Sequence, residues 1–157
     1  MSISLHNVYL GLGSNLGDRE DNIQKTLSLI ERRIGKIVAV SSMYRTEPVG
    51  FESDNYFVNA ACILQTELSP LEVLEYTQVV EKELGRNVKS INGKYHDRII
   101  DIDVLLYDSL IVEYPHYILP HPHLHERKFV LEPLAEIASH IVHPILHKTI
   151  GELNKEL

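Results

Sequence analysis

The stretch Lys94-Tyr-His-Asp-Arg-Ile-Ile-Asp-Ile-Asp-Val-Leu-Leu-Tyr107 contains the pattern around which the rest of the chain is organised. From Ile100 onward its residues alternate as those of a buried strand do, because successive side chains point to opposite faces. One face carries four apolar residues, Ile100, Ile102, Val104 and Leu106, and the other carries Asp101, Asp103, Leu105 and Tyr107. Since both faces are largely apolar, we expect this strand to lie in the interior of its sheet.

Asp101 and Asp103 stand at positions i and i+2 of this strand, so both carboxylates share one face. Their Cα atoms are expected about 6.5–7 Å apart, since a strand rises about 3.3 Å per residue. Two anions this close repel each other, and burial raises the cost further, so a compensating cation is expected. One or two divalent cations suit these oxygen ligands, with Mg²⁺ and phosphate the usual case, and Arg98 is the second candidate. The alternative is an exposed edge strand with two solvated acids.

The composition is typical of one folded domain, which we expect to span residues 1–157. Apolar residues make up 44% of the chain and charged residues 24%. No apolar run approaches the roughly 20 residues of a membrane span, and the N-terminus does not resemble a signal peptide, so no membrane partner is expected. The single cysteine, Cys62, excludes an internal disulfide and lies in an apolar stretch, which favours a buried thiol and a cytoplasmic protein.

The formal net charge of −7 argues against a general nucleic-acid-binding protein, which would need a basic face. A small phosphate ligand remains possible, because a local basic cluster is enough to bind one. Six basic residues gather near the acid pair and in the segment after it: Arg86, Lys89, Lys94, Arg98, Arg127 and Lys128. We expect small-molecule partners and a monomeric chain.

Hydrophobic periodicity predicts the order strand, helix, strand, strand, helix, strand, with the strands at residues 8–12, 36–44, 56–65 and 100–107. This order predicts an α+β fold, a ferredoxin-like βαββαβ sandwich with both helices on one face of a mainly antiparallel sheet. Long loops are expected at residues 45–55 and 86–97. Extra C-terminal elements follow: further strand at 110–118 and helices at 129–139 and 149–157.

Both central helices carry start and stop signals. Asp18 is the expected N-cap of the first helix, and Gly35 ends it. The second begins with Ser69-Pro-Leu-Glu72, an N-cap serine with a capping-box glutamate, and ends at Gly85. Its buried side is expected to consist of four apolar residues, Leu71, Leu74, Val80 and Leu84.

Three glycines, Gly11, Gly13 and Gly17, lie between the first strand and the first helix and invite comparison with a dinucleotide-binding loop. The second strand has no acidic residue for a ribose, and the later elements do not continue βαβ, so that interpretation fails. A tight turn, or close approach of a flat ligand to the backbone, is favoured over a phosphate cradle.

The chain has nine histidines, and two groups crowd the C-terminal third, one around His121, His123 and His125 and one around His143 and His147. A zinc site is conceivable. However, prolines interrupt both groups, no cysteine lies nearby and no His-Glu-x-x-His pattern occurs. Surface or capping roles are favoured for most of them, with a single histidine as a phosphate donor.

Two further positions indicate a ligand. Gln78 and Glu81 are spaced i, i+3 on the second helix and share a face, either as a solvated pair or as part of a site. Asn59 lies inside an apolar strand, where its amide needs partners and could read the edge of an amide-like heterocycle. Phe57, two residues earlier on the same side, could stack on such a ring.

Six segments, in this order, carry a resemblance to a known family: Gly11-Leu-Gly-Ser-Asn-Leu-Gly-Asp18, Ser42-Met-Tyr-Arg-Thr-Glu-Pro-Val-Gly50, Phe57-Val-Asn-Ala60, Glu83-Leu-Gly-Arg86, Asp97-Arg-Ile-Ile-Asp-Ile-Asp-Val104 and Leu119-Pro-His-Pro-His-Leu-His-Glu-Arg-Lys-Phe-Val-Leu131. The chain closely resembles the 6-hydroxymethyl-7,8-dihydropterin pyrophosphokinases of folate biosynthesis. The likeness covers almost the whole chain, and the Arg-x-x-Asp-x-Asp strand with the later Pro-His and Glu-Arg-x-Phe segments is highly specific.

The resemblance implies that ATP donates its β,γ-pyrophosphoryl group to the pterin hydroxymethyl and leaves as AMP. It implies that Asp101 and Asp103 hold two Mg²⁺ ions on the triphosphate and that Arg98 contacts phosphate. The implied ATP-binding residues are Gln78, Glu81, Arg86, Lys94, Arg98, Val104, His121 and Arg127. The implied pterin-binding residues are Thr46, Val49, Phe57, Asn59 and Phe129, with the two phenylalanines on either side of the ring.

One segment departs from the family pattern. Many relatives carry Arg-Trp-Gly-Pro-Arg before the acids, and here Lys94-Tyr-His-Asp-Arg98 stands in its place. Arg98 is retained, whereas Lys94 in place of an arginine exchanges a bidentate fork for a point charge. Pro122 also follows His121 where some relatives have an aromatic residue.

Overall fold

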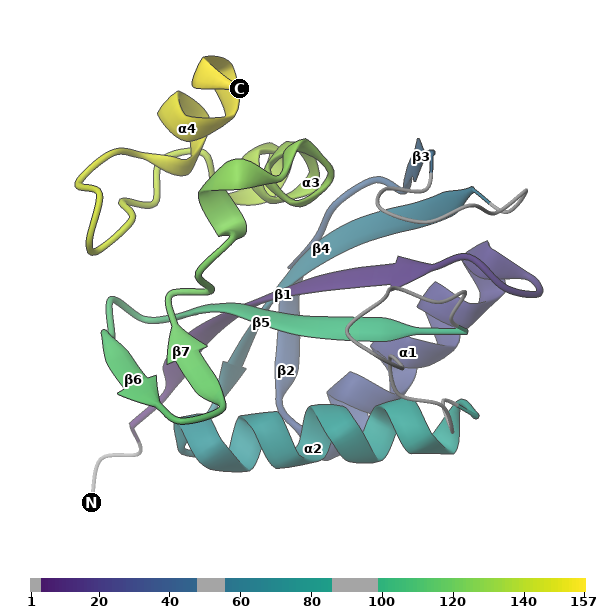
Figure 1. Ribbon diagram of the computed structural model, residues 1–157. Coiled ribbons are helices and arrows are strands. Elements are labelled where there is room, and N and C mark those ends of the chain that lie inside the picture. Colours follow the sequence, from purple (N-terminus) through teal and green to yellow (C-terminus); the bar gives the residue numbers. More distant parts are fainter. Residues whose placement is uncertain (1–3, 48–55, 86–98) are drawn as a thin grey trace.

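The computed structural model describes residues 4–47, 56–85 and 99–157. Seven strands are described there: β1 (His6–Ser14), β2 (Lys36–Val40), β3 (Tyr44–Thr46), β4 (Phe57–Thr66), β5 (Asp101–Tyr107), β6 (Val112–Tyr114) and β7 (Tyr117–Leu119). The helices are α1 (Arg19–Arg33), α2 (Pro70–Glu83), α3 (Lys128–Ala138) and α4 (Ile150–Glu156), with a 3₁₀ turn at Leu124–Glu126 (Figure 1).

The central sheet has the strand order β2-β4-β1-β5, and β3 also pairs with β4. All of these pairs are antiparallel. Together with α1 and α2, the sheet confirms the predicted α+β class. The strand expected at residues 36–44 is two strands on the same edge of β4. Between them, the Ser41 hydroxyl accepts the backbone N–H of Ala61 and donates to the Ser42 carbonyl.

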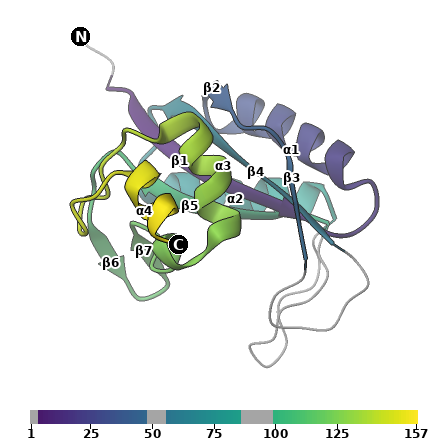
Figure 2. The ribbon, with the colours of Figure 1, turned by 90° about the horizontal axis from the view of Figure 1, so that it is seen from above.

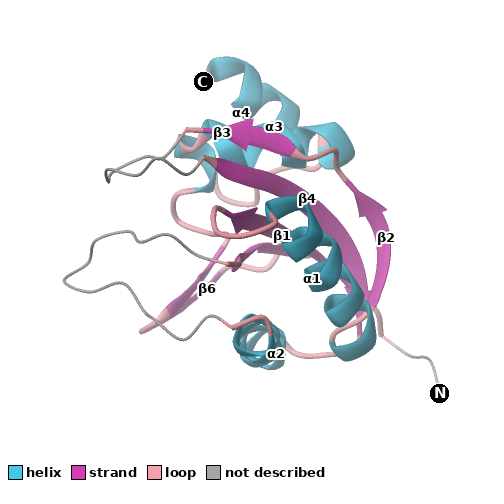
Figure 3. Ribbon diagram, turned by 90° about the vertical axis from the view of Figure 1, so that its right-hand side faces the viewer, coloured by secondary structure: helices cyan, strands magenta, loops and turns pink. Residues whose placement is uncertain are grey.

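Helices cover both faces of the sheet (Figures 1 and 3). On one face, a core cluster forms between the strands, α1 and α2; its members include Val8, Leu10, Ile23, Ile30, Leu64, Val80 and Val104. On the other, a second cluster forms under α3 and α4; its members include Tyr9, Ala61, Leu105, Leu106, Leu131 and Leu134. Figure 2 shows α3 and α4 lying over the sheet. The predicted placement of α1 and α2 on one face is therefore confirmed, and the C-terminal helices cover the other face.

Strand β5, which carries the two acids, is at the edge of the central sheet, so the prediction of an interior strand is wrong. Its apolar character has another cause, because core clusters lie against both of its faces. Its outer edge is also partly satisfied. The Glu81 carboxylate of α2 accepts the Ile102 N–H at 2.9 Å, and the His121 N–H donates to the Leu105 carbonyl at 2.9 Å.

A β-bulge breaks the predicted alternation of β5. Tyr9 pairs with Leu106 and Leu10 with Val104, so Leu105 is an extra residue in the strand. Leu105 and Leu106 therefore both pack in the cluster under α3 and α4, whereas Tyr107 packs on the α1 and α2 side. The sequence had predicted the reverse, with Leu106 on the face of Ile102 and Val104 and Tyr107 on the face of the two acids.

The predicted helix caps are confirmed. Asp18 accepts the Asp21 N–H as N-cap of α1, and Ser69 with Glu72 forms a complete capping box on α2. The predicted buried side of α2 is partly wrong, because Leu71 is 41% exposed. The buried residues of α2 are Val73, Thr77, Val80 and Glu81. Residues 110–118 contain a turn between β6 and β7, which pair as a hairpin rather than as one strand.

Candidate active site

Two rows of residues cross the sheet on the side that faces α3. In the first row, Gly13 of β1 pairs with Asn59 of β4 on one side and with Asp101 of β5 on the other. In the second, Gly11 pairs with Ala61 and Asp103. Paired residues of neighbouring strands project to the same face, about 5 Å apart along the row. The amide and the first carboxylate are thus separated by one glycine, with no side chain between them.

The glycines differ in their roles. Gly11 and Gly13 lie within β1, so the prediction of a turn is wrong for them and holds for Gly17, whose φ is +70°. A Cβ on Gly13 would lie 3.0 Å from the Asn59 Oδ1 and 3.8 Å from the Phe57 ring. A side chain at position 13 would therefore crowd the Asn59 amide where the polar end of β4 approaches the β1 backbone. The alternative that the sequence left open, the close approach of a flat ligand to this backbone, stays a prediction.

Asn59 is held by the neighbouring strand. It is 6% exposed, and its Nδ2 donates to the Thr46 Oγ1 of β3 at 2.7 Å. Thr46 pairs with Phe57 across the β3–β4 ladder, so Thr46, Phe57 and Asn59 form one group. Because Nδ2 has two protons, the amide keeps donor capacity for a ligand while its orientation is fixed.

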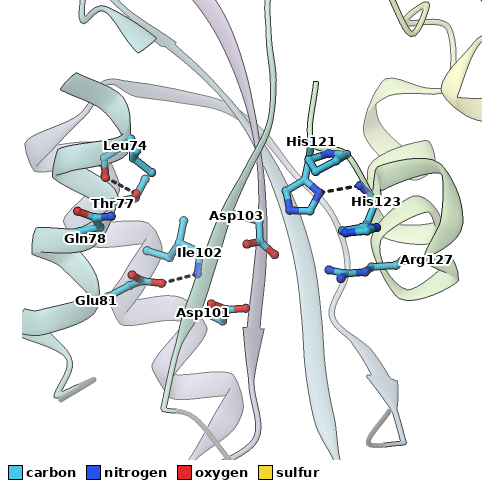
Figure 4. A pocket seen from close by; sticks show the side chains of 11 residues that line it. Leu74, Thr77, Gln78, Glu81, Asp101, Ile102, Asp103, His121, His123 and Arg127 are labelled. Atoms are coloured by element: carbon cyan, nitrogen blue, oxygen red, sulfur yellow. Dashed lines mark hydrogen bonds between the residues drawn. The ribbon is translucent and has the colours of Figure 1, made fainter. Parts of the chain in front are cut away.

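A groove of about 470 Å³ surrounds the acid-bearing edge of β5. Its lining comes from three segments: α2 with Leu74, Thr77, Gln78 and Glu81, β5 with Asp101, Ile102 and Asp103, and the segment with His121, Pro122, His123 and Arg127. Figure 4 shows the α2 side chains on one side of β5 and His121, His123 and Arg127 on the other. Six of the residues singled out from the sequence thus lie around one groove.

Glu81 differs from its neighbour Gln78. It is 8% exposed and receives the Ile102 N–H, whereas Gln78 is exposed. Both residues of the i, i+3 pair therefore line the groove, and Glu81 also holds the edge of β5 against α2. Thr77 and Leu74 were not singled out from the sequence, although their spacing from Gln78 and Glu81 on one helix would have indicated them.

His121 is a neutral donor in this groove. The His123 N–H donates to its Nδ1 at 3.2 Å, so the ring proton is on Nε2. Burial, with the nearby Arg127 and His123, lowers its pKa to about 4, although Asp101 opposes the shift. At neutral pH the ring therefore offers an uncharged N–H.

Arg127 and Phe129 lie at the start of α3. Arg127 occupies the N-cap position and lines the groove, and its Cζ lies 5.9 Å from the centroid of the Phe129 ring. Phe129 packs partly buried against the cluster under α3. One helix end therefore carries both a groove cation and the aromatic residue singled out for stacking.

The remaining predicted residues lie elsewhere. Val104 is 5% exposed in the α1 and α2 core and does not line the groove. Val49, Arg86, Lys94 and Arg98 fall outside the described residues. The expected loops at 45–55 and 86–97 fall mostly outside them too.

Asp101 and Asp103 are the groove residues suited to a metal. Both are partly exposed on the same face, which fits Mg²⁺, an ion that proteins usually bind through one or two carboxylates together with substrate phosphates. Within residues 4–47, 56–85 and 99–157, no three His, Cys, Asp or Glu side chains gather as a metal site. The described histidines thus give no support to the zinc alternative.

The chain is similar to one known protein family. The family profile of 7,8-dihydro-6-hydroxymethylpterin-pyrophosphokinase (HPPK) matches residues 9–139. The chain belongs to this family. A 2-amino-4-hydroxy-6-hydroxymethyldihydropteridine pyrophosphokinase of Porphyromonas gingivalis is 48% identical over 83% of this chain and 90% of the relative. One of Bacillus subtilis is 42% identical over 85% of this chain and 78% of the relative.

Solved structures show the same HPPK fold. Wild-type Plasmodium falciparum HPPK-DHPS with SDX-DHP superimposes with a TM-score of 0.77 at 18% identity. This chain is covered to 98% and spans 44% of that longer chain. All the predicted ATP-, pterin- and metal-binding residues fall within the segment that the HPPK profile matches.

Proposed function

We propose that this HPPK family member transfers the pyrophosphoryl group of ATP to the hydroxymethyl group of 6-hydroxymethyl-7,8-dihydropterin, giving the pterin diphosphate and AMP. The supporting observation is the row Asn59–Gly13–Asp101, which joins an amide suited to a heterocycle edge to a carboxylate suited to metal-bound phosphate. A flat ring on Asn59 can lie close to the β1 backbone because Gly13 has no side chain. Its substituent can then extend toward Asp101.

The groove around β5 is proposed as the ATP site. Arg127 and the neutral His121 would donate to phosphate oxygens, while Gln78 and Glu81 line the α2 side. Arg86, Lys94 and Arg98 are proposed to add contacts from outside the described residues, whereas the buried side chain of Val104 would act only by packing behind the groove.

The pterin is proposed to bind on the polar end of β4. Asn59 would pair with the ring edge in the orientation that Thr46 fixes, and Phe57 and Phe129 would stack on the ring. Val49, outside the described residues, is proposed as a further contact.

The reaction requires positioning and charge stabilisation. The pterin hydroxyl oxygen forms a bond to the β-phosphorus and releases its proton to solvent. The bond from that phosphorus to the α-phosphate oxygen breaks, and AMP leaves with that oxygen. Asp101 and Asp103 would hold two Mg²⁺ ions, which supply charge neutralisation on the triphosphate when bound. Arg127 and His121 would orient the phosphates, and Asn59 would orient the acceptor, so that the attack is in line.

The deciding experiment measures AMP formation from ATP with and without reduced 6-hydroxymethylpterin, in the presence and absence of Mg²⁺. AMP and pterin diphosphate in equal amounts, only with both substrates and the metal, are expected. Release of ADP, or AMP formation without the pterin, would contradict the proposal.

The state of the protein is also a proposal. A single domain over residues 1–157, a monomer of 18.0 kDa and a cytoplasmic location stay predictions. In the described part of the chain, no helix combines the length and apolar character needed to cross a membrane. Cys62 is fully buried, and burial raises its pKa to about 12, as expected for a structural thiol. A single cooperative thermal transition is expected for one domain, and light scattering tests the monomeric state.

A further inference from the structure

A carboxylate on α3 connects this helix to the start of β3. Both oxygens of Glu136 lie 3.0 Å from the Ser42 backbone N–H, and Oε2 also accepts the Ser42 hydroxyl at 3.1 Å. Oε1 accepts the Tyr44 hydroxyl at 2.6 Å. The three partners come from two residues more than 90 positions earlier in the sequence. We call this group, Ser42, Tyr44 and Glu136, the α3–β3 clamp.

The clamp holds a strand that needs support. Strand β3 has three residues and pairs only with β4 among the described strands. Such a short edge strand has few ladder hydrogen bonds of its own. The hydrogen bonds to an ionised acceptor are stronger than neutral ones, and Tyr44 lowers the pKa of Glu136, in keeping with a carboxylate that stays ionised.

The clamp lies next to the group formed by Thr46, Phe57 and Asn59. Tyr44 pairs directly with Asn59, and Thr46 pairs with Phe57. Since Thr46 orients the Asn59 amide at 2.7 Å, a shift of β3 along or away from β4 changes the direction of that amide. The path from Glu136 to Asn59 runs through Tyr44, the β3 backbone and Thr46.

The other end of the clamp is on α3, which also packs on the sheet through Leu131 and Leu134. Glu136 lies seven residues after Phe129, which puts both on the same side of the helix, two turns apart. A helix anchored to β3 at Glu136 therefore has a defined angle over the sheet, and Phe129 and Arg127 at its start have a defined position.

We propose that Glu136 is a positioning residue for the acceptor, and that the α3–β3 clamp sets the spacing between Asn59 on β4 and Phe129 on α3. The inference rests on the proposed function, because it assigns these two residues to the pterin. Glu136 itself touches no substrate.

The test compares Glu136→Gln and Tyr44→Phe with Glu132→Gln. Gln keeps the shape but places an NH₂ group against one of the donors, and Phe removes only the hydroxyl. Glu132 is on the same helix one turn earlier and close enough to act on Tyr44 electrostatically, so its variant removes the same charge and leaves the clamp intact. Titration with 6-hydroxymethylpterin, followed by its own fluorescence, gives a readout independent of turnover.

We expect Glu136→Gln and Tyr44→Phe to weaken pterin binding and raise its KM about five- to tenfold, the effect of one lost hydrogen bond. In these two variants the KM for ATP should change by less than about twofold. In Glu132→Gln, pterin binding and both KM values should equal those of the unmodified protein. The double variant should lose no more than Glu136→Gln alone, because both changes break one unit.

Equal losses for both substrates, or pterin binding as in the unmodified protein, would overturn the inference. If the unmodified protein forms AMP but the variants bind pterin normally, the clamp fails and the proposed function stands. If the unmodified protein forms no AMP, the proposed function is wrong, and the pterin titration still tests the positioning role of the clamp. A protein that does not bind the pterin at all excludes both.

Discussion

Two parts of the same sheet face have opposite characters. Near one end of β1, β4 and β5 the paired rows are polar or bare, with Asn59, Gly13 and Asp101 in one and Ala61, Gly11 and Asp103 in the next. The following row, Ile63, Tyr9 and Leu106, packs under α3 and α4. The β1–β4 pairing continues through all three rows, whereas the β1–β5 pairing skips Leu105 between the second row and the third. The difference lies in the side chains, and it separates a ligand surface from a core within one interstrand ladder.

If the proposed function is correct, binding and stability depend on different rows. The first two rows bear the acids and an amide, whereas the next row buries apolar surface. Substitutions in the first rows should therefore affect activity at nearly constant stability, and substitutions in the packed row should do the reverse.

The largest effect is expected from Asp101→Asn and Asp103→Asn. Each removes one of two anions proposed to hold the metal, and turnover should fall by about 10²–10³-fold, as when a transition-state charge loses its partner. The free energy of unfolding should change far less than turnover, because both side chains are partly exposed. AMP assays and thermal melts measure the two quantities.

Asp108→Asn is the control for these variants, since Asp108 directly follows β5 and bonds to His6 rather than lining the groove. It should keep full turnover. Full turnover in Asp101→Asn or Asp103→Asn as well would show that the acid-bearing rows are not needed for activity.

Leu105→Ala should have the opposite effect. Leu105 is 1% exposed in the cluster under α3, and truncation of such a leucine typically costs about 2–5 kcal/mol of folding free energy. Turnover per folded molecule should be retained below the melting transition. Chemical denaturation gives the free energy. A variant with unchanged stability would show that the cluster under α3 and α4 is not the core it is taken to be.

Gly13→Ala should have an intermediate effect that separates the two glycines. The new Cβ would lie 3.0 Å from the Asn59 Oδ1, so the amide must move, and the KM for the pterin should rise by roughly tenfold.

Gly11→Ala is the matched control, because its Cβ would meet the flexible end of Leu105 at 3.4 Å. It should change the pterin KM little. Equal KM values in the two variants would show that the approach of Asn59 to β1 is unimportant for the acceptor.

The smallest effect concerns pH. The pKa of His121 is lowered from 6.5 to about 4 in the folded protein, mainly by burial, so the unfolded chain binds more protons between these values. Stability should therefore fall as the pH decreases from 6.5 to 4, by up to about 1 kcal/mol per pH unit. Denaturation curves of the protein and of His121→Gln, with NMR titration of the ring, measure this. An equal slope in His121→Gln, or a ring pKa near 6.5, would contradict the assignment.

Local signals predicted much of the fold. The cap at Asp18 and the capping box of Ser69 and Glu72 lie where the sequence indicated, because caps depend on neighbouring residues. The edge position of β5 was missed, because an edge strand covered on both faces has the same composition as an interior one. The bulge at Leu105 and the exposure of Leu71 were missed as well, since each depends on the partner element.

The candidate site was predicted as residue types rather than as an arrangement. Gln78, Glu81, Asp101, Asp103, His121 and Arg127 were singled out, and all line one groove. The role of Glu81 at the edge of β5, and the clamp at Glu136, had no signal in the sequence, because their partners are distant in the chain.

The sequence alone determined which residues have chemistry to offer and which segments become helices and strands, since both follow from residue type and short-range periodicity. Only the tertiary structure decided that Asn59 and Asp101 share a row across Gly13. That arrangement depends on antiparallel pairing between strands more than 40 residues apart, which is fixed by the burial of two cores against opposite faces of one sheet.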